Sequence, residues 1–181
     1  MVVLSTDLII IMGGPASGKT TLARQLAAEL SLPILSKDDI KEALFDVLGF
    51  SDRERSRRLS DACFAAQLRM AETQLDAGLS CLLEGNWRAG HAGGVLEAQA
   101  RSGARTAQVW CHASTAVILR RFEARVRHPG HLDAAGLAEE VKQTAGLPPA
   151  FLDIGGPRWM YDSEHPAAYP ALLRDLKIWR M

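Results

Sequence analysis

Residues Leu8-Ile9-Ile10-Ile11-Met12-Gly13-Gly14-Pro15-Ala16-Ser17-Gly18-Lys19-Thr20 form the stretch that decides the fold. Its second half has the spacing G-x-x-x-x-G-K-[ST], which is that of the phosphate-binding P-loop. The unbroken apolar run before it is typical of a strand buried on both faces of a parallel sheet. Residues 21–30 follow with apolar side chains at helical spacing. Strand, loop and helix therefore come in the order that a nucleotide-binding P-loop needs.

The residue types of this loop suit phosphate binding. Gly13 and Gly18 can adopt backbone angles that a β-carbon penalises, so that successive N–H groups can turn toward phosphate oxygens. The positive end of the following helix adds to this attraction. Lys19 is predicted to reach the β- and γ-phosphates, and the Thr20 hydroxyl to hold Mg²⁺. The plainer alternative is a Gly-rich turn that fits the pattern by chance. The predicted nucleotide-binding residues are Gly13, Gly14, Ala16, Ser17, Gly18, Lys19, Thr20 and Thr21.

Length and composition set the class of protein. The 181 residues suit a single domain over residues 1–181, and the 21 basic residues balance the 21 acidic ones. Because nucleic-acid binders usually carry a basic excess, this balance argues against a nucleic-acid partner. The three cysteines, Cys63, Cys81 and Cys111, are far apart, which favours reduced core thiols over disulfides or zinc. Neither a signal peptide nor a membrane span is expected, and a cytoplasmic location is predicted.

A second strand is predicted over residues 32–36, followed by a helix over residues 37–48 that Gly49 ends. Asp38 or Asp39 could simply cap this helix, since acids favour a helix N-terminus. The other interpretation is functional. The carboxyl end of a strand in a doubly wound sheet faces the ligand crevice, where a carboxylate could accept a proton from a substrate hydroxyl.

A long helix is predicted over residues 51–78, and its first turns carry the Arg53–Arg58 cluster. That cluster is either a solvated face or a surface for a phosphate or a partner. A third strand over residues 79–83 leads into Glu84 and Asn86. P-loop proteins place a second acidic group at this point, near Mg²⁺ and the attacking group. The alternative is an acid at a strand end that points to solvent.

The rest of the chain predicts a fourth strand over residues 105–112, a fifth over residues 159–161 and a closing helix over residues 166–179. Between them, a helix capped by Ser114 or Thr115 is expected to bury Ala116, Val117, Leu119, Phe122 and Val126. It also carries Arg120, Arg121, Arg125 and Arg127, and it ends at His128-Pro129-Gly130-His131. A short helix over residues 133–141 is predicted next. The two histidines suit a turn or a lid better than a metal site, because no third ligand is nearby.

The order of these pieces resembles the small P-loop kinases that include polynucleotide kinase, chloramphenicol phosphotransferase, zeta-toxin-like proteins and AAA_33-type ATP-binding proteins. The resemblance rests on four motifs and covers nearly the whole chain. They are the P-loop itself, Ser36-Lys-Asp-Asp-Ile-Lys41, Glu84-Gly85-Asn86 and Arg121-Phe-Glu-Ala-Arg125. It implies the three-layer α/β/α sandwich of a P-loop NTPase, with a mainly parallel five-stranded sheet and an Arg-containing helical lid at about residues 120–135.

The resemblance also implies roles for single residues. The first Asp of an Asp-Asp-x-Arg motif is the general base in the polynucleotide kinases, and it corresponds to Asp38. The substrate-contacting Arg corresponds to Lys41, which departs from the pattern and cannot make a bidentate contact. Glu84 and Asn86 would lie beside the substrate. Arg121 and Arg125 would clamp the ATP phosphates as the lid closes.

Together these patterns predict an ATP-dependent and Mg²⁺-dependent kinase that phosphorylates a hydroxyl of a small-molecule or nucleotide-like acceptor. Lys19, Asp38, Arg121 and Arg125 are the predicted catalytic residues. The rival hypothesis is a regulatory NTPase that acts on a protein partner and uses water as the acceptor. A polynucleotide 5′-kinase is a third class, disfavoured by the zero net charge and by Lys41. Asp38 discriminates between the first two, because only a kinase needs a base at the acceptor.

Overall fold

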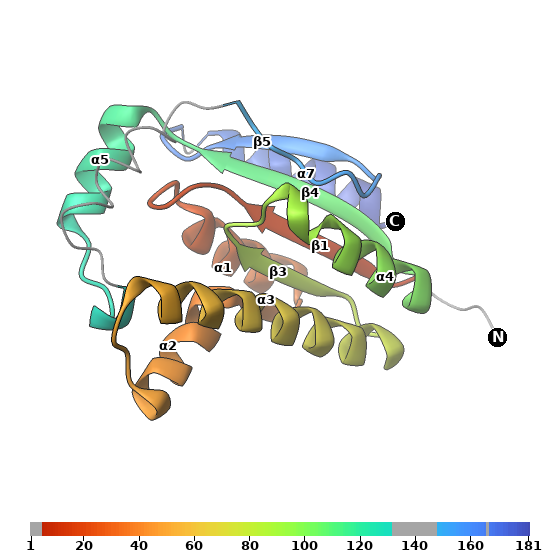
Figure 1. Cartoon of the computed structure of the whole chain (residues 1–181). Helices are drawn as coiled ribbons and strands as arrows, with labels where there is room; N and C mark the ends of the chain where they lie inside the picture. The colour runs from red at the N-terminus through yellow and green to blue at the C-terminus, as the bar shows by residue number, and fades with distance from the viewer. Residues whose placement is uncertain (1–4, 132–147, 166) are drawn as a thin grey trace.

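The computed structural model describes residues 5–131, 148–165 and 167–181, and five strands of this part of the chain form one parallel sheet (Figure 1). Every neighbouring pair of strands in the sheet is parallel, and the spatial order is β2-β3-β1-β4-β5. The strands are β1 (Asp7–Met12), β2 (Ile34–Ser36), β3 (Cys81–Gly85), β4 (Arg105–His112) and β5 (Arg158–Asp162). The predicted five-stranded parallel sheet is therefore confirmed.

The central strand β1 is buried along its whole length, as its unbroken apolar run predicts. Its side chains alternate between the two faces of the sheet. Leu8, Ile10 and Met12 belong to one core cluster, while Ile9 and Ile11 belong to the other. Strand β1 therefore contributes side chains to the core on both faces of the sheet, and this packing fixes the position of the loop that follows it.

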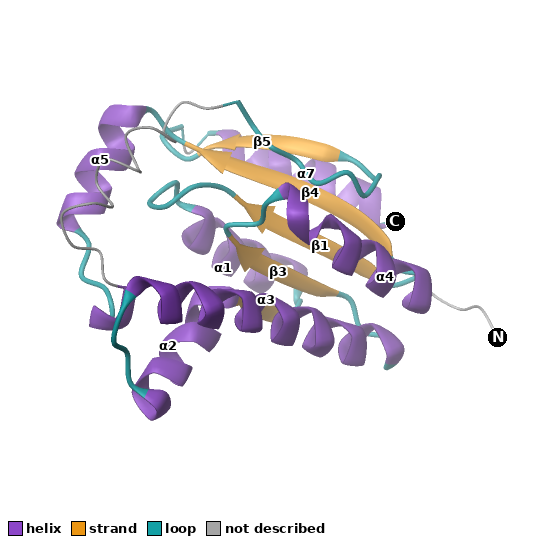
Figure 2. Cartoon of the chain, in the orientation of Figure 1, coloured by secondary structure: helices purple, strands orange, loops and turns teal. Residues whose placement is uncertain are grey.

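Helices cover both faces of the sheet and complete the predicted three layers (Figure 2). On one face, α3 (Arg53–Asp76) and α4 (Ala92–Ser102) contribute Phe64, Leu75 and Val95 to the core. On the other face, α1 (Lys19–Leu30) and α7 (Ala168–Arg180) contribute side chains such as Leu26 and Leu176. The three cysteines are buried and free, as predicted.

Two further helices, α2 (Lys37–Leu48) and α5 (Thr115–Ala124), lie beyond the carboxyl edge of the sheet, on the left of Figure 1. The short 3₁₀ turns η1 (Ala89–His91) and η2 (Pro129–His131) precede α4 and follow α5. In parallel α/β sheets the carboxyl edge is where ligands bind. The arrangement therefore brings α2 and the segment after α5 to the same edge as the P-loop.

Several predicted boundaries and core positions need correction. Strand β3 extends to Gly85, so Glu84 lies inside the strand and is buried. Helix α5 ends at Ala124, and Val126, which was expected to face inward, is 99% exposed. In α2 the predicted apolar positions Val47 and Leu48 are exposed, whereas Phe45 is the buried aromatic residue.

Part of the predicted lid lies outside the residues described. The short helix expected over residues 133–141 and the end of the lid near residue 135 fall in this region. Among the helices that the structure does describe, none is both long enough and apolar enough to cross a membrane.

Candidate active site

The P-loop follows β1 and needs glycine at two of its positions. Gly13 has φ +150, and a Cβ atom there would lie 2.3 Å from the carbonyl oxygen of Cys111. Gly18 has φ +93, and a Cβ atom there would lie 2.9 Å from the Cβ atom of Ser163. Both sites combine an unfavourable backbone angle with a close neighbour, which only glycine tolerates. Gly18 is also the N-cap of α1, so the loop amides and the helix N-terminus face the same region.

Three side chains meet directly beyond this loop. Lys19 Nζ donates to the carbonyl of Gly14 at 3.3 Å and lies 3.9 Å from Glu84 Oε1. The Thr20 hydroxyl donates to the same Glu84 oxygen at 3.2 Å. The structure therefore brings the predicted phosphate-binding Lys19 and the predicted metal ligand Thr20 together with Glu84, from a strand 64 residues further along the chain.

This oxygen set fits Mg²⁺. The ion prefers hard oxygen ligands and is usually held by one or two protein groups together with substrate phosphates. Thr20 and Glu84 supply a hydroxyl and a carboxylate oxygen next to the P-loop. Only Thr20 was predicted as a ligand. Thr20 as a Mg²⁺ ligand stays a prediction, and the position of the Glu84 carboxylate beside it adds a second candidate ligand.

Glu84 is 1% exposed and is held by two residues that the sequence did not single out. The Ser36 hydroxyl donates to Glu84 Oε2 at 2.9 Å. The Gln67 amide, which is fully buried, donates to the main-chain carbonyls of Glu84 and Leu35. Gln67 thus joins α3 to the ends of β2 and β3. The Ser36 bond orients the carboxylate, and the Gln67 bonds hold the main chain at Glu84. The polar Gln67 inside the apolar stripe of α3 was the signal available in the sequence.

Asp38 stands in the first turn of α2, directly after β2. The cap of this helix is Ser36, whose hydroxyl accepts from the Asp39 amide at 3.4 Å, so neither Asp38 nor Asp39 serves as the N-cap. Asp38 Oδ1 accepts from Lys37 Nζ at 2.8 Å, and Oδ2 accepts from Arg127 Nη2 at 2.7 Å. Asp39 instead points to solvent beside Arg24, at 3.7 Å. The carboxylate predicted as the base is therefore held between two cations.

These cations control the charge of Asp38. Burial raises the pKa of its carboxyl group, but Lys37, Arg127 and Lys19 outweigh burial and hold the pKa well below its usual range. Asp38 is therefore ionised at every pH near neutrality. The effect of Lys19 also means that Asp38 lies within electrostatic range of the predicted phosphate-binding lysine.

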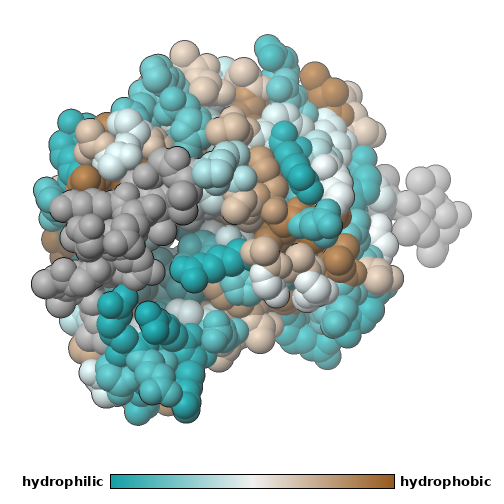
Figure 3. Space-filling model, turned by 45° about the horizontal axis from the view of Figure 1, so that its top comes forward, coloured by the Kyte–Doolittle hydropathy of each residue, from teal (hydrophilic) through white to brown (hydrophobic). Residues whose placement is uncertain are grey.

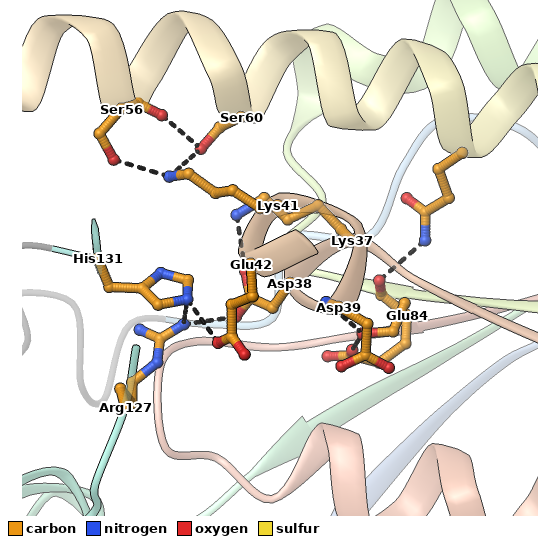
Figure 4. A network of polar contacts seen from close by, with 12 residues as sticks. Lys37, Asp38, Asp39, Lys41, Glu42, Ser56, Ser60, Glu84, Arg127 and His131 are labelled. Carbon is orange, nitrogen blue, oxygen red and sulfur yellow. Dashed lines mark hydrogen bonds and ion pairs between the residues drawn. The ribbon is translucent and has the colours of Figure 1, made fainter. Parts of the chain in front are cut away.

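Lys41, one turn further along α2, is buried with 5% of its surface exposed. Its ammonium group donates to the Ser56 and Ser60 hydroxyls of α3, each at 2.8 Å (Figure 4). It also lies 5.2 Å from the centre of the Phe45 ring. Burial, with Lys37 next in effect, lowers the pKa of Lys41 to about 8.

The structure separates the lid arginines. Arg121 donates to the hydroxyl and the carbonyl of Ser163, at 2.7 and 3.2 Å, and lies close to Gly18. Arg125 lies over the Phe122 ring, 4.2 Å from its centre. Arg127 is the arginine that contacts Asp38, yet it was not among the predicted site residues. Because α5 ends at Ala124, helical spacing could not show which arginine faces Asp38.

The segment after α5 packs along one side of α2. His131 Nε2 lies 2.7 Å from Glu42 Oε1, and His128 Nε2 lies 3.0 Å from Asp46 Oδ1. Phe45 stacks on the His128 ring and meets His131 edge-on. Figure 4 shows His131 and Arg127 approaching Glu42 and Asp38 from the segment that follows α5. His131 ends the 3₁₀ turn η2, and His128 directly precedes it. Among the described residues, no three or more His, Cys, Asp or Glu side chains gather as a metal site would need.

The remaining predicted residues lie near the same edge of the sheet. Asn86 follows β3 and is half-buried, while Thr21 is exposed on α1. Gly14, Ala16 and Ser17 complete the loop, and Ala16 has a positive φ of 58. In Figure 3, hydrophilic residues line one side of a hollow toward this edge. The roles of these residues stay predictions.

Comparisons with known proteins agree with this arrangement. The family model described as AAA domain matches residues 8–147, which is more than half of the chain. One solved structure, of a proposed kinase from Chloroflexus aurantiacus, is 34% identical in sequence to this chain and superposes on it with a TM-score of 0.86. That match covers 96% of this chain and 97% of the other.

Two curated proteins match over part of their length. Shikimate kinase of Bradyrhizobium diazoefficiens is 31% identical over 125 residues, covering 67% of this chain and 56% of that protein. Adenylate kinase 2 of Synechocystis is 34% identical over 83 residues, covering 42% of this chain and 46% of that protein. The chain thus spans about half the length of the curated relatives it matches.

Proposed function

The chain belongs to the AAA-domain family, and we propose that it is an ATP-dependent, Mg²⁺-dependent kinase that phosphorylates a hydroxyl of a small-molecule or nucleotide-like acceptor. The two curated proteins described above are kinases. The observation that carries the proposal is the meeting of three groups at one edge of the sheet. They are the P-loop Lys19, the Thr20–Glu84 oxygen pair and the ionised carboxylate of Asp38.

In this proposal the P-loop end of the site binds the nucleotide. The loop amides and Lys19 would hold the ATP phosphates, and Thr20 and Glu84 would hold Mg²⁺. Bound Mg²⁺ neutralises charge on the phosphate oxygens. Arg121, already next to Gly18, would add positive charge on the other side of the loop. Such fixed charges stabilise the transition state because they need little reorganisation during transfer.

Asp38 would position the acceptor. Its carboxylate would accept a hydrogen bond from the acceptor hydroxyl and take that proton as the new P–O bond forms and the bond to ADP breaks. An acid with so low a pKa is a weak base. It can still take this proton, because the hydroxyl becomes strongly acidic as its oxygen bonds to phosphorus. A regulatory NTPase would not need a carboxylate here.

Residues 120–131 would act as the lid. They carry Arg121 and Arg127 to opposite ends of the site, one beside Gly18 and the other on Asp38. Closure of such a segment excludes water and completes the charged site.

The test is a screen of hydroxyl compounds with ATP and Mg²⁺ that follows ADP release. The kinase predicts at least one acceptor that raises ADP release about tenfold or more above hydrolysis in water, with a phosphorylated product visible by ³¹P NMR. ATP turnover that no acceptor stimulates would contradict the proposal and favour the regulatory NTPase.

A further inference from the structure

Strand β5 forms one edge of the sheet and pairs with β4 on its inner side (Figure 1). The register shows which main-chain groups face β4, because the Ser163 N–H, just after β5, donates to the carbonyl of His112 at 2.9 Å. Along a strand these groups point alternately to its two sides. The odd-numbered residues of β5 therefore face β4, and the even-numbered ones, which are Arg158, Met160 and Asp162, face outward.

The outward side of β5 is open for pairing. Among the residues that the structure describes, none forms a hydrogen bond with the main-chain N–H or C=O of Arg158 or Met160, whereas the Asp162 carbonyl accepts from the His165 N–H at 3.3 Å. The Met160 side chain is 55% exposed. Proteins commonly block such an edge with lysine, proline or a bulge. Strand β5 contains neither lysine nor proline, and its register with β4 is unbroken.

The sequence of β5, Arg-Trp-Met-Tyr-Asp, is complementary to itself when two copies run antiparallel. With Met160 on the axis, Arg158 of each copy lies opposite Asp162 of the other, and Trp159 lies opposite Tyr161. Opposite charges and aromatic pairs at facing positions stabilise antiparallel strands. Parallel pairing in register would instead place equal charges side by side at both ends of the strand. The charges of β5 therefore favour an antiparallel copy of the same strand as its partner.

The contacts of these two charges within the chain leave them accessible. Arg158 Nη2 donates to the carbonyl of Leu152 at 3.0 Å and lies 3.9 Å from Oδ1 of the fully exposed Asp153. Asp162 Oδ2 lies 2.8 Å from His165 Nδ1. The Arg158 side chain is still 42% exposed and that of Asp162 33%. Each can therefore reach a further charge across the edge of the sheet.

We propose that a second copy of this chain binds along β5, so that the two sheets join into one across a two-fold axis at Met160. This inference goes beyond the proposed kinase function and does not depend on it. At the axis, Met160 of each copy would exchange both main-chain hydrogen bonds with the other, as facing residues with outward groups do in antiparallel strands. The same surface serves both copies, as the symmetry of a two-fold dimer requires.

Sedimentation equilibrium of the whole chain over a range of concentrations tests the proposal. The mass of the wild type should rise from 19.7 kDa toward twice this value as the concentration increases. Met160→Lys sets two ammonium groups face to face, and Arg158→Glu sets a carboxylate opposite Asp162, so each should weaken self-association at least tenfold. Met70→Lys is the matched control, because this methionine is 45% exposed on α3. A wild type that stays monomeric, or undiminished association of either β5 variant, overturns the proposal.

A second measurement on the wild type covers the case in which the β5 variants do not fold. The Met160 amide faces outward, so the dimer should protect it from hydrogen exchange, while the Tyr161 amide faces β4 and is protected in either state. NMR follows the exchange of both amides below and above the dissociation constant found by sedimentation. We expect the Met160 amide to exchange at least tenfold more slowly in the dimer. An unchanged rate for Met160 would mean that the copies associate through another surface and overturns the proposal.

Discussion

Asp38 shows how neighbouring charges select the role of a single carboxylate. Asp38 and Asp39 are adjacent in sequence, but only Asp38 faces Lys37 and Arg127, while Asp39 is 60% exposed. The folded-state pKa of Asp38 lies below the unfolded value of 3.8. Its ion pairs therefore stabilise the fold above about pH 4 and lose this effect as the pH falls through the folded-state pKa.

Lys19 is the residue on which nucleotide binding should depend most. Lys19→Ala removes the ammonium group but leaves the loop glycines and α1 in place. Hydrogen bonds to charged groups contribute about 1.5–3 kcal/mol, so we expect ATP to bind roughly 10- to 100-fold more weakly. Calorimetric titration with AMP-PNP and Mg²⁺ measures this, with Lys177→Ala as the control. Wild-type affinity in Lys19→Ala would mean that the loop does not bind phosphates in the predicted manner.

The lowered pKa of Lys41 predicts that the stability of the fold depends on pH, independently of catalysis. Its pKa is 10.5 in the unfolded chain and about 8 in the folded protein. Between these values the unfolded chain binds more protons, so the free energy of unfolding should rise with pH over this window. Over the whole window, deprotonation of Lys41 should raise the free energy of unfolding by about 3 kcal/mol. Urea unfolding from pH 7 to pH 10.5 should show the rise in the wild type and its absence in Lys41→Met. Parallel curves for the two proteins would contradict the prediction.

At the scale of elements, α2 and residues 127–131 form one unit. Asp38, Glu42 and Asp46 recur every four residues along α2, and they meet Arg127, His131 and His128. Burial, with Arg127 next in effect, lowers the pKa of His131 although Glu42 and Asp38 oppose this. The Nε2 atom of this ring lies between Glu42 Oε1, at 2.7 Å, and Arg127 Nη2, at 3.0 Å, so the histidine links α2 to the segment that follows α5.

Gly130 is the position that tests this docking. It is buried against Phe45, and a Cβ atom there would lie 2.5 Å from a carbon of the Phe45 ring. Gly130→Ala should push the segment away from α2 and raise the hydrogen-exchange rates of amides 127–131 about tenfold, a loss of about 1.4 kcal/mol of protection. Gly90→Ala is the matched control, because nothing lies within 4 Å of its Cβ position. Unchanged exchange in Gly130→Ala would mean that the segment does not pack on α2.

The sequence predicts elements well where local patterns decide them. The apolar run of β1 and the P-loop spacing are such patterns, and both are found as expected. The sequence does not predict the buried positions or the end of a helix where tertiary contacts determine them. The apolar pattern of α2 favours Val47 and Leu48, but the segment 127–131 packs against the helix at Phe45 and buries this ring instead. The end of α5 is missed for a similar reason, since Arg127 leaves the helical spacing to reach Asp38.

The same reasoning applies to the site. Lys19 and Thr20 could be named from the P-loop spacing, and Glu84 and Asp38 because each stands at or just after the end of an apolar strand. Ser36, Gln67 and Arg127 could not, because their roles depend on which distant residue each one meets.

At the scale of the whole molecule, a charged cluster ties the opposite edge of the sheet together. Asp7, at the start of β1, is 3% exposed and pairs with Arg105 of β4 at 2.7 Å and with Arg180 of α7 at 3.2 Å. The cluster joins the first strand to the last helix. It lies at the amino end of the strands, away from the P-loop, so it should serve stability and not catalysis.

Asp7→Asn tests this division of the molecule. Removing one partner of a buried ion pair lowers the free energy of unfolding by about 3–5 kcal/mol. Because Arg105 is partly exposed, we expect a loss near the lower value. Chemical denaturation should show this loss, while AMP-PNP affinity at a temperature where the variant stays folded should match the wild type. Weaker nucleotide binding by the folded variant would show that the two edges of the sheet are coupled.

The most direct test of the account is phosphoryl transfer by Asp38→Asn, with Asp39→Asn as its neighbour control. Asparagine keeps the shape of the side chain but cannot take the proton, and general-base catalysis typically contributes 10²- to 10⁴-fold. With the acceptor found by the screen, Asp38→Asn should bind AMP-PNP as the wild type does and transfer phosphate about 100-fold more slowly or worse, while Asp39→Asn stays near the wild-type rate. Transfer by Asp38→Asn at the wild-type rate would contradict the account at its central residue.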